Sequence, residues 1–318
     1  MSSLHVGSTR SRTEHRLSVE SPYRLDLTVS VLRRLSSNLV DLLTPEGEYV
    51  RALGASQGPL IARVSQSGPT ALMVTLAGAE SEHAWGLAVV RRILGVDRDL
   101  TYFNDAAASI PWLKALAERM RGVRPPRYPT LWEACVNAVV FQQLSLIAAT
   151  AIMHRLTVAL GKPAESDGVR HYLFPSAASF LRADHALLRA AGLSLGKLAT
   201  LRRVGEALAA GTLDEAMLEE LPSPDAAALL GGIKGIGPWT AAVILLRGLG
   251  RLDVFPMNDT SVARNLVFVA GYGAAVDIEA TLRSLSPQQG MLYYHLLLAR
   301  LEAQRDLRRP SVPSRAAR

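Results

Sequence analysis

The most constraining feature of this 318-residue chain is a glycine turn between two apolar segments. Residues 229–259 read LLGGIKGIGPWTAAVILLRGLGRLDVFPMND. Glycine adopts positive φ without a steric penalty, so Gly235 and Gly237 favour a tight hairpin. Pro238 suits the first turn of a following helix, whose free backbone N–H groups can hold an anion such as a phosphate. The pattern predicts two helices joined by a turn that a sugar-phosphate backbone can approach closely.

The same segment resembles the helix-hairpin-helix motif of the DNA glycosylase superfamily, in which a Gly-[hydrophobic]-Gly hairpin precedes a catalytic aspartate. Gly-Ile-Gly-Pro-Trp-Thr-Ala at 235–241 and Asp-Val-Phe-Pro at 253–256 are most similar to the 3-methyladenine DNA glycosylase II branch. The resemblance extends weakly from about Tyr23 to Leu301. It implies a monovalent cation held by hairpin carbonyls and no other cofactor or metal. It also implies DNA contacts from Ile233, Lys234, Gly235, Ile236, Gly237 and Thr240.

Asp259 is the predicted catalytic residue. Cleavage of an N-glycosidic bond passes through an oxocarbenium-like state, which a carboxylate can stabilise while it orients or deprotonates a water. An alkylated purine already carries positive charge and leaves readily, so one carboxylate suffices. In the resembled family this aspartate opens a helix. Asp259 is also a favoured helix N-cap, and the two roles are compatible.

Trp239 distinguishes between two reactions. In bifunctional members of the resembled family a lysine stands here and forms a Schiff base that cleaves the strand. Tryptophan has no amine, so we expect a monofunctional enzyme that leaves an abasic site. The indole either stacks against a flipped, electron-poor base or closes the helix pair as a core residue.

Two adjacent glutamines, Gln142 and Gln143, interrupt an apolar pattern that begins at Leu131. Buried amides need partners, so the pair is unusual there. In the resembled family this position ends a helix in a turn whose side chain fills the gap left by the extruded base. The resemblance implies that Gln143 is the wedge, with Leu144 next and Gln142 beside them. The alternative is two glutamines on a solvated helix face.

Trp239, Tyr293 and Tyr294 are the predicted lining of the base pocket. Well-known members of the resembled family line this pocket with several aromatic rings. Val243, Leu297 and Leu298 stand at such positions here, so a ring-rich pocket is not assured and the lesion range stays open.

The composition limits the partners, the cofactors and the cellular compartment that we expect for this chain. A net charge of +7 suits a polyanionic partner, although arginine-rich chains arise for other reasons as well. The single cysteine excludes an internal disulfide and a four-cysteine iron–sulfur cluster. No apolar run approaches the ~18–20 residues of a membrane span, and the first twenty residues are no secretory signal. We expect a monomeric, cytoplasmic, nucleoid-associated protein that binds damaged double-stranded DNA and no membrane.

Hydrophobic periodicity predicts an α+β N-terminal domain at 21–108, followed by an all-α helix-hairpin-helix glycosylase domain at 109–302. A flexible basic arm at 1–20 and a disordered basic tail at 303–318 flank them. In the first domain we expect strands at 23–29, 49–53, 60–64 and 72–76 and a helix at 83–94. In the second we expect helices at 110–121, from 131 onward behind a Thr130–Glu133 capping box, and at 177–182, 186–191, 198–210, 213–221, 262–271, 278–285 and 290–301.

These residues predict a monofunctional DNA glycosylase that excises alkylated purines of the 3-methyladenine type in base excision repair. Two alternatives stay open. A glycosylase for another damaged base, uracil-type or oxidised, would need an acid or strong hydrogen bonds to a neutral leaving group, and obvious helix-borne donors are few. A non-catalytic helix-hairpin-helix DNA-binding protein would gain nothing from Asp259, because phosphate binding needs no carboxylate.

Overall fold

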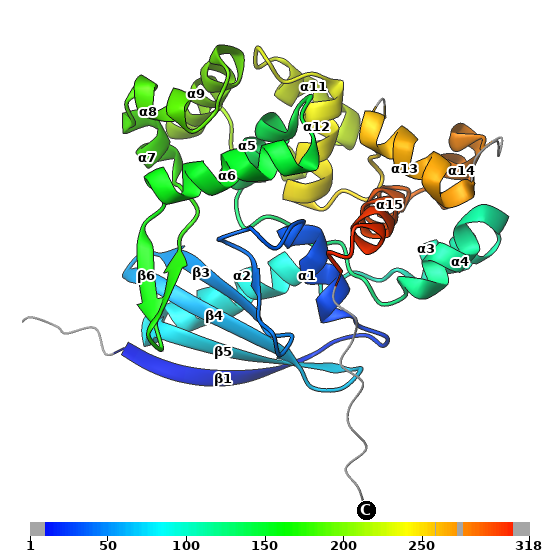
Figure 1. Ribbon diagram of the computed structural model, residues 1–318, viewed down its shortest axis with the longest axis horizontal. Helices are drawn as coiled ribbons and strands as arrows, with labels where there is room; N and C mark the ends of the chain where they lie inside the picture. Colours follow the sequence, from blue (N-terminus) through cyan, green and yellow to red (C-terminus); the bar gives the residue numbers. More distant parts are fainter. Residues whose placement is uncertain (1–9, 258, 272–275, 308–318) are drawn as a thin grey trace, which may run out of the picture.

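An antiparallel sheet lies beneath a body of helices (Figure 1). The structure is a computed structural model that describes residues 10–257, 259–271 and 276–307. Within those residues the sheet has five strands in the order β1-β5-β4-β3-β2. They are β1 (Arg10–Ser18), β2 (Leu42–Leu43), β3 (Tyr49–Ala55), β4 (Gly58–Gln66) and β5 (Ala71–Ala79). The predicted order of an α+β part followed by a helical part is confirmed.

The strands predicted at 49–53, 60–64 and 72–76 are confirmed as the centres of β3, β4 and β5, and α2 (His83–Leu94) has the predicted bounds. The prediction of a flexible arm at 1–20 is wrong for residues 10–18, because β1 pairs with β5 along its whole length. Its side chains are mostly polar, which hid it from a hydrophobic pattern. Thr13 of β1 also hydrogen-bonds His83 Nδ1 at 2.8 Å, which fixes this edge strand to α2.

The strand predicted at 23–29 is wrong, because this segment is the helix α1 (Leu25–Arg33). Its apolar residues alternate because both sides of the helix are buried. Leu25, Val29 and Leu32 pack into the core formed with the sheet. Leu27 and Val31 pack into a second core formed with the C-terminal helices. A helix buried on two sides therefore imitates the period of a strand.

The helical part begins earlier than the predicted boundary at residue 109. Its first helices are α3 (Thr101–Ala108) and α4 (Pro111–Arg119), which pack on each other. The amide of Phe103 donates to Gln288 Oε1 at 3.0 Å, and Gln288 Nε2 donates to the Asp99 carbonyl at 2.9 Å. These bonds attach α3 to the C-terminal helices.

The central helices follow the predicted series, and the structure adds two short strands between them. The elements in chain order are α5 (Leu131–Phe141), α6 (Leu146–Leu160), β6 (Pro163–Ser166), β7 (Val169–Tyr172), α7 (Ala177–Arg182), α8 (His185–Ala190), α9 (Leu195–Ala209), α10 (Glu215–Glu220), α11 (Ser223–Gly231) and α12 (Pro238–Ile244). The pair β6 and β7 was not predicted, so this part is not purely helical. Its short strands carry charged residues and no apolar alternation, which leaves no strand pattern to detect.

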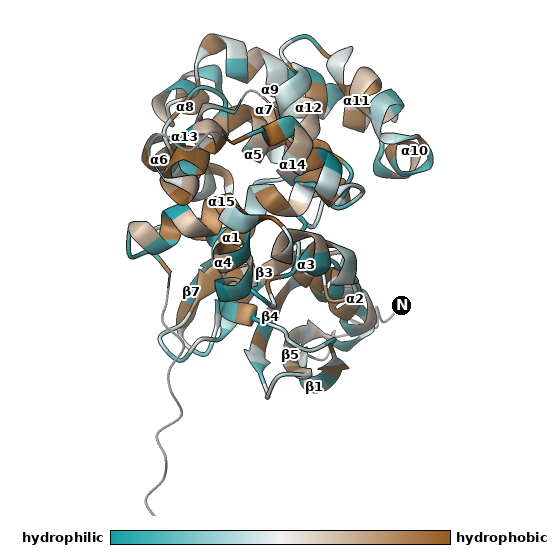
Figure 2. Cartoon of the chain, turned by 90° about the vertical axis from the view of Figure 1, so that its right-hand side faces the viewer, coloured by the Kyte–Doolittle hydropathy of each residue, from teal (hydrophilic) through white to brown (hydrophobic). Residues whose placement is uncertain are grey.

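The C-terminal helices are α13 (Thr260–Ala270), α14 (Ile278–Leu285) and α15 (Gly290–Ala303), and a π-helical turn at Leu245–Leu249 precedes them. Seen from the side, α15 lies beside α1 and α4 at the centre of the molecule, with apolar residues along all three (Figure 2). The tail predicted from residue 303 is ordered as far as the structure describes it. The Asp306 carbonyl accepts a hydrogen bond from Arg33, and Leu307 packs on the second core. Residues 308–318 lie outside the described part.

No helix in the described part of the chain is long and apolar enough to cross a membrane.

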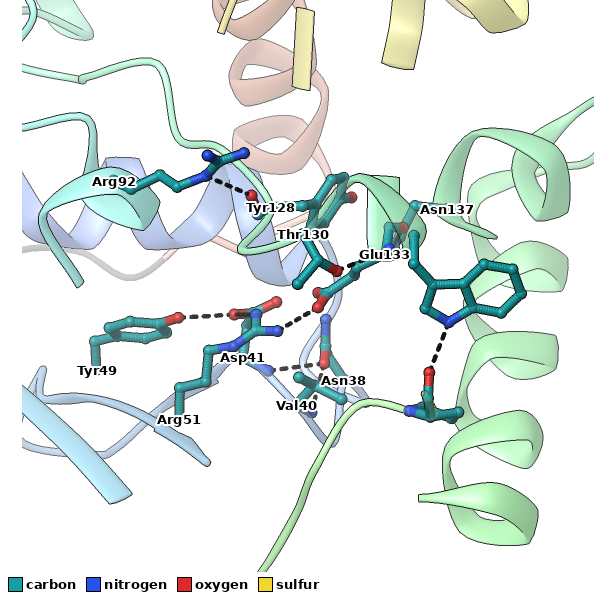
Figure 3. A network of polar contacts seen from close by, with 12 residues as sticks. Asn38, Val40, Asp41, Tyr49, Arg51, Arg92, Tyr128, Thr130, Glu133 and Asn137 are labelled. Atoms are coloured by element: carbon teal, nitrogen blue, oxygen red, sulfur yellow. Dashed lines mark hydrogen bonds and ion pairs between the residues drawn. The ribbon is translucent and has the colours of Figure 1, made fainter. Parts of the chain in front are cut away.

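A buried ion-pair network joins the sheet to the helices (Figure 3). Arg51 of β3 contacts Asp41 and, on α5, Glu133, each at 2.6 Å, and the Tyr49 hydroxyl donates to Asp41 at 2.8 Å. Burial alone would lower the pKa of Arg51, but the two carboxylates outweigh it and hold that pKa well above its usual value. Thr130 Oγ accepts the Glu133 amide at 3.2 Å, as half of the predicted capping box. The other half is absent here because Arg51 takes the Glu133 carboxylate.

Candidate active site

The two hairpin glycines have different structural roles. Gly235 has a φ of +103°, and an added Cβ would lie 1.9 Å from Thr200 Oγ1 on α9. Only glycine fits at this position. Gly237 has a φ of −90°, and a Cβ there would meet nothing within 4 Å. The fold therefore requires Gly235, whereas Gly237 leaves open space on the surface at the start of α12.

Gln142, at the end of α5, supports the hairpin. Its Nε2 donates to the Gly235 carbonyl at 3.0 Å and to Thr240 Oγ1 at 2.7 Å. Thr240 and Ile236 are buried, Ile233 is half-buried, and Lys234 is exposed. In this arrangement Gln142 and Thr240 act by holding the hairpin in place, and Lys234, Gly235 and Gly237 form its exposed face. Direct DNA contact by the buried Thr240 side chain is not compatible with this packing.

The hairpin carbonyls give little support to the predicted monovalent cation. Ile233 O accepts the Ile236 amide at 2.9 Å, and Gly235 O accepts from Gln142. Lys234 O accepts from both Thr200 and Arg203. These three oxygens already have partners within the chain, so the cation stays a prediction and no step below depends on it.

The turn between α5 and α6 presents Gln143. This residue is exposed and has a φ of +54°, a left-handed conformation that is unfavourable for a side chain other than glycine. Leu144 beside it is 36% exposed. Lys197 anchors the turn from behind, because its Nζ donates to the carbonyls of Val140 and Gln142, each at 2.8 Å. Burial lowers the pKa of Lys197. The structure thus places Gln143 at the exposed tip of a braced turn, and its role as the wedge stays a prediction.

Asp259 and Trp239 form a direct contact across 20 residues of sequence. Trp239 Nε1 donates to Asp259 Oδ2 at 2.9 Å, and the amide of Val262 donates to Asp259 Oδ1 at 3.3 Å. Asp259 therefore does act as the N-cap of α13, as one of its two predicted roles requires. Both of its carboxylate oxygens are oriented, and both Asp259 and Trp239 are half-buried. The carboxylate is thus held beside the first turn of α12, directly after the hairpin.

The two tyrosines predicted for the base pocket differ in burial and in their neighbours. Tyr294 is 0% exposed, and its hydroxyl donates to the Leu246 carbonyl at 3.2 Å. It is a core residue in this structure, so its assignment to the pocket is corrected. Tyr293, one residue earlier on α15, is half-buried and lies near the guanidinium groups of Arg34 and Arg247. Burial lowers the pKa of Arg34, and the neighbouring tyrosines offset this only in part.

A small cavity lies between the α1–β2 segment and the helices α5 and α6. Arg34, Asp41, Tyr128, Phe141 and Thr150 are among its lining residues, whereas Asp259 and Trp239 are not. The Arg34 guanidinium lies over the Phe141 ring at 3.6 Å from its centroid. The burial of Arg34 has no signal in the sequence, because an arginine at the end of a helix usually lies in solvent.

Several known proteins are similar to this chain in sequence or in fold. The model of a family described as HhH-GPD superfamily base excision DNA repair protein matches residues 136–287. A DNA-3-methyladenine glycosylase of Bacillus subtilis is 30% identical over 171 residues, which cover 54% of this chain and 56% of that protein. The chain thus spans little more than half the length of this relative. The protein YfjP of the same species is 27% identical over 248 residues, 77% of this chain and 84% of the relative.

The same fold occurs in a solved structure. A 3-methyladenine DNA glycosylase from Archaeoglobus fulgidus superposes with a TM-score of 0.77 over 91% of this chain and 99% of that one. The two sequences are 21% identical, so this likeness concerns the fold. The matched family segment contains the hairpin, the braced turn and the Asp259–Trp239 contact. Residues 136–287 are thus similar to the HhH-GPD superfamily of base excision DNA repair proteins, and the chain shares the fold of the Archaeoglobus fulgidus structure.

Proposed function

We propose that this protein is a monofunctional DNA glycosylase that releases alkylated purines of the 3-methyladenine type from double-stranded DNA. The observation that carries the proposal is the Asp259–Trp239 contact of 2.9 Å beside the glycine hairpin. The names of the Bacillus subtilis and Archaeoglobus fulgidus relatives support the choice of substrate.

Asp259 would act on the sugar of the damaged nucleotide. As the N-glycosidic bond breaks, positive charge develops at C1′ and the ring oxygen, and a fixed carboxylate stabilises it. Trp239 and the Val262 amide orient the two carboxylate oxygens beforehand, so little reorganisation is needed during the reaction. The same carboxylate accepts the proton of the water that attacks C1′. Trp239 carries no amine, so no Schiff base forms at this position.

DNA would lie across the exposed face of the hairpin and the α5–α6 turn. Lys234 and the open surface at Gly237 suit a phosphate group, and the net charge of +7 favours any DNA strand. Extrusion of a base costs a few kcal/mol of lost stacking and pairing, which a gap-filling Gln143 would offset. A monomer is enough for this arrangement, and a protein that repairs chromosomal DNA works in the compartment of the nucleoid.

The test is release of bases from alkylated duplex DNA by the full chain and by two matched variants. Asp259→Asn removes the proposed catalytic carboxylate. Asp253→Asn makes the same chemical change on an exposed residue of the preceding loop and serves as its control. We expect 3-methyladenine or 7-methylguanine to be released by the unmodified protein and by Asp253→Asn only, with no strand cleavage before alkali treatment.

Two results would contradict the proposal. Absence of release from alkylated DNA, with duplex binding intact, would reduce the chain to a DNA-binding protein. Release that Asp259→Asn leaves unchanged would mean that another group performs the chemistry.

A further inference from the structure

Lys197 lies in the first turn of a helix, where its charge is unfavourable. It is the third residue of α9, and its amide donates to the Oγ of the N-cap residue Ser194 at 3.3 Å. The N-terminal end of a helix carries partial positive charge, which repels an ammonium group. Lys197 is also half-buried, and burial lowers its pKa. Neither effect stabilises α9, so the contacts of the side chain must account for a lysine at this position.

The Lys197 ammonium group caps the end of α5. Its Nζ donates to the carbonyls of Val140 and Gln142, each at 2.8 Å. The last carbonyls of a helix have no partner within it, and the C-terminal end carries partial negative charge. One ammonium group therefore satisfies two carbonyls directly before Gln143. The direction in which the chain leaves α5 is fixed by these two bonds.

Gln142 connects the same turn to the hairpin. Its backbone carbonyl accepts from Lys197, while its Nε2 donates to the Gly235 carbonyl at 3.0 Å and to Thr240 Oγ1 at 2.7 Å. The helices agree with this arrangement, because α5 packs against both α9 and α12 (Figure 1). The turn is thus held from two sides through one residue.

α9 also holds the hairpin directly. Arg203 donates to the Lys234 carbonyl at 3.2 Å, and Thr200 donates to the same oxygen at 3.3 Å. Gly235 lies so close to Thr200 that an added Cβ would be 1.9 Å from its Oγ1. α9, the turn and the hairpin therefore contact one another in all three pairs, and Lys197 joins α9 to the turn.

We propose that Lys197 is a positioning residue for base extrusion. It holds the α5–α6 turn at a fixed place relative to the hairpin, so that Gln143 enters the base stack while the hairpin holds the DNA backbone. This inference rests on the proposed glycosylase function and deepens it, because it assigns a residue to the extrusion step. Lys197 acts through Gln142 and Gln143 and takes no part in bond cleavage.

The effect of Lys197 should depend on how firmly the duplex holds the damaged base. Extrusion from an intact pair loses stacking and pairing, and the loss is smaller for a mismatched base. A wedge on a fixed turn can offset this loss at once, whereas a mobile turn must first be ordered at a cost in conformational entropy. Removal of the Lys197 ammonium group should therefore slow excision of a well-paired base more than excision of a mismatched one.

The experiment measures single-turnover release of 7-methylguanine placed opposite cytosine or opposite a mismatched adenine. We expect Lys197→Met to slow release from the cytosine duplex about tenfold, the rate equivalent of one hydrogen bond from a charged group. Release from the mismatched duplex should slow by less than about threefold. Lys197→Arg keeps the charge and the donors and should recover most of the rate. Lys114→Met removes the same charge from an exposed residue of α4 and is the control.

A double variant separates positioning from a general loss of structure. Gln143→Gly removes the proposed wedge, so adding Lys197→Met to it should slow release from the cytosine duplex no further. A merely structural defect would add to the first loss. Thermal melting checks that each variant folds. If Lys197→Met does not fold, Lys197→Gln takes its place, because the amide can still donate to one of the two carbonyls.

Three results would overturn the inference and leave the proposed function standing. They are an unchanged rate of Lys197→Met on the cytosine duplex, equal slowing of both duplexes, and additive slowing in the double variant. Absence of release from both duplexes by the unmodified protein would instead overturn the proposed function, and the inference with it.

Discussion

Replacing Trp239 by phenylalanine tests whether the indole orients the catalytic carboxylate. The change removes the Nε1 donor that lies 2.9 Å from Asp259 Oδ2 and keeps a smaller aromatic ring. A hydrogen bond to a charged group contributes about 1.5–3 kcal/mol. Asp259 is half-buried and keeps the Val262 amide, so the lower end of that range applies. We therefore expect Trp239→Phe to lower kcat about tenfold and to leave KM almost unchanged.

The assay is single-turnover release of 7-methylguanine from a defined duplex, with Trp239→Ala and Asp259→Asn measured alongside. If Trp239 acts through Asp259, adding Trp239→Phe to the Asp259→Asn variant should slow it no further. If Trp239 acts only by stacking on the base, Trp239→Phe should keep the full rate and Trp239→Ala should lose it. That second pattern would refute the orienting role.

Three further predictions concern the turn residues and the core histidine. Gly235→Ala should lower the free energy of unfolding by at least about 1–2 kcal/mol, because Gly235 has a positive φ and an added Cβ would meet Thr200. Gly237→Ala should keep the melting temperature, because a Cβ there meets nothing within 4 Å, but it should weaken binding to duplex DNA. Gln143→Gly should stabilise the protein by roughly 1 kcal/mol in thermal melts and still slow base excision, since it relieves a left-handed residue and removes the wedge; unchanged excision would exclude Gln143 as the wedge. Burial lowers the pKa of His295 from 6.5 to about 4, so the unfolded chain binds more protons between these pH values, and stability should fall by about 3 kcal/mol as pH decreases from 6.5 to 4. Urea unfolding of His295→Gln across that range should show a smaller decrease.

The elements predicted best from the sequence are those whose structure depends on residues close together in the chain. β3, β4 and β5 are short apolar runs separated by turns that contain glycine, serine or proline, and α14 has the predicted bounds Ile278–Leu285. The hairpin was predictable because glycine and proline restrict the backbone locally. Asp259 was placed at a helix start by the same reasoning, although its partner Trp239 was known only as a neighbour in the motif.

The errors came from contacts between distant parts of the chain. α1 imitates a strand because two separate cores bury it, and no local window contains both cores. β1 has polar side chains and is held by its backbone bonds to β5. Tyr294 was misjudged and the burial of Arg34 was not foreseen, for a related reason. Their neighbours decide whether a ring faces a ligand or the core, and whether a guanidinium is solvated.

The double packing of α1 has a consequence for how the molecule unfolds. Leu25, Val29 and Leu32 complete one core, while Leu27 and Val31 complete the other, so neither core can lose this helix without exposing the opposite one. The sheet and the helical body therefore form a single cooperative unit, although they look separable along the chain. A fragment that starts at residue 109 would uncover the side of α15 that α1 covers. The smallest piece with the complete glycosylase core must therefore retain Leu25–Arg33.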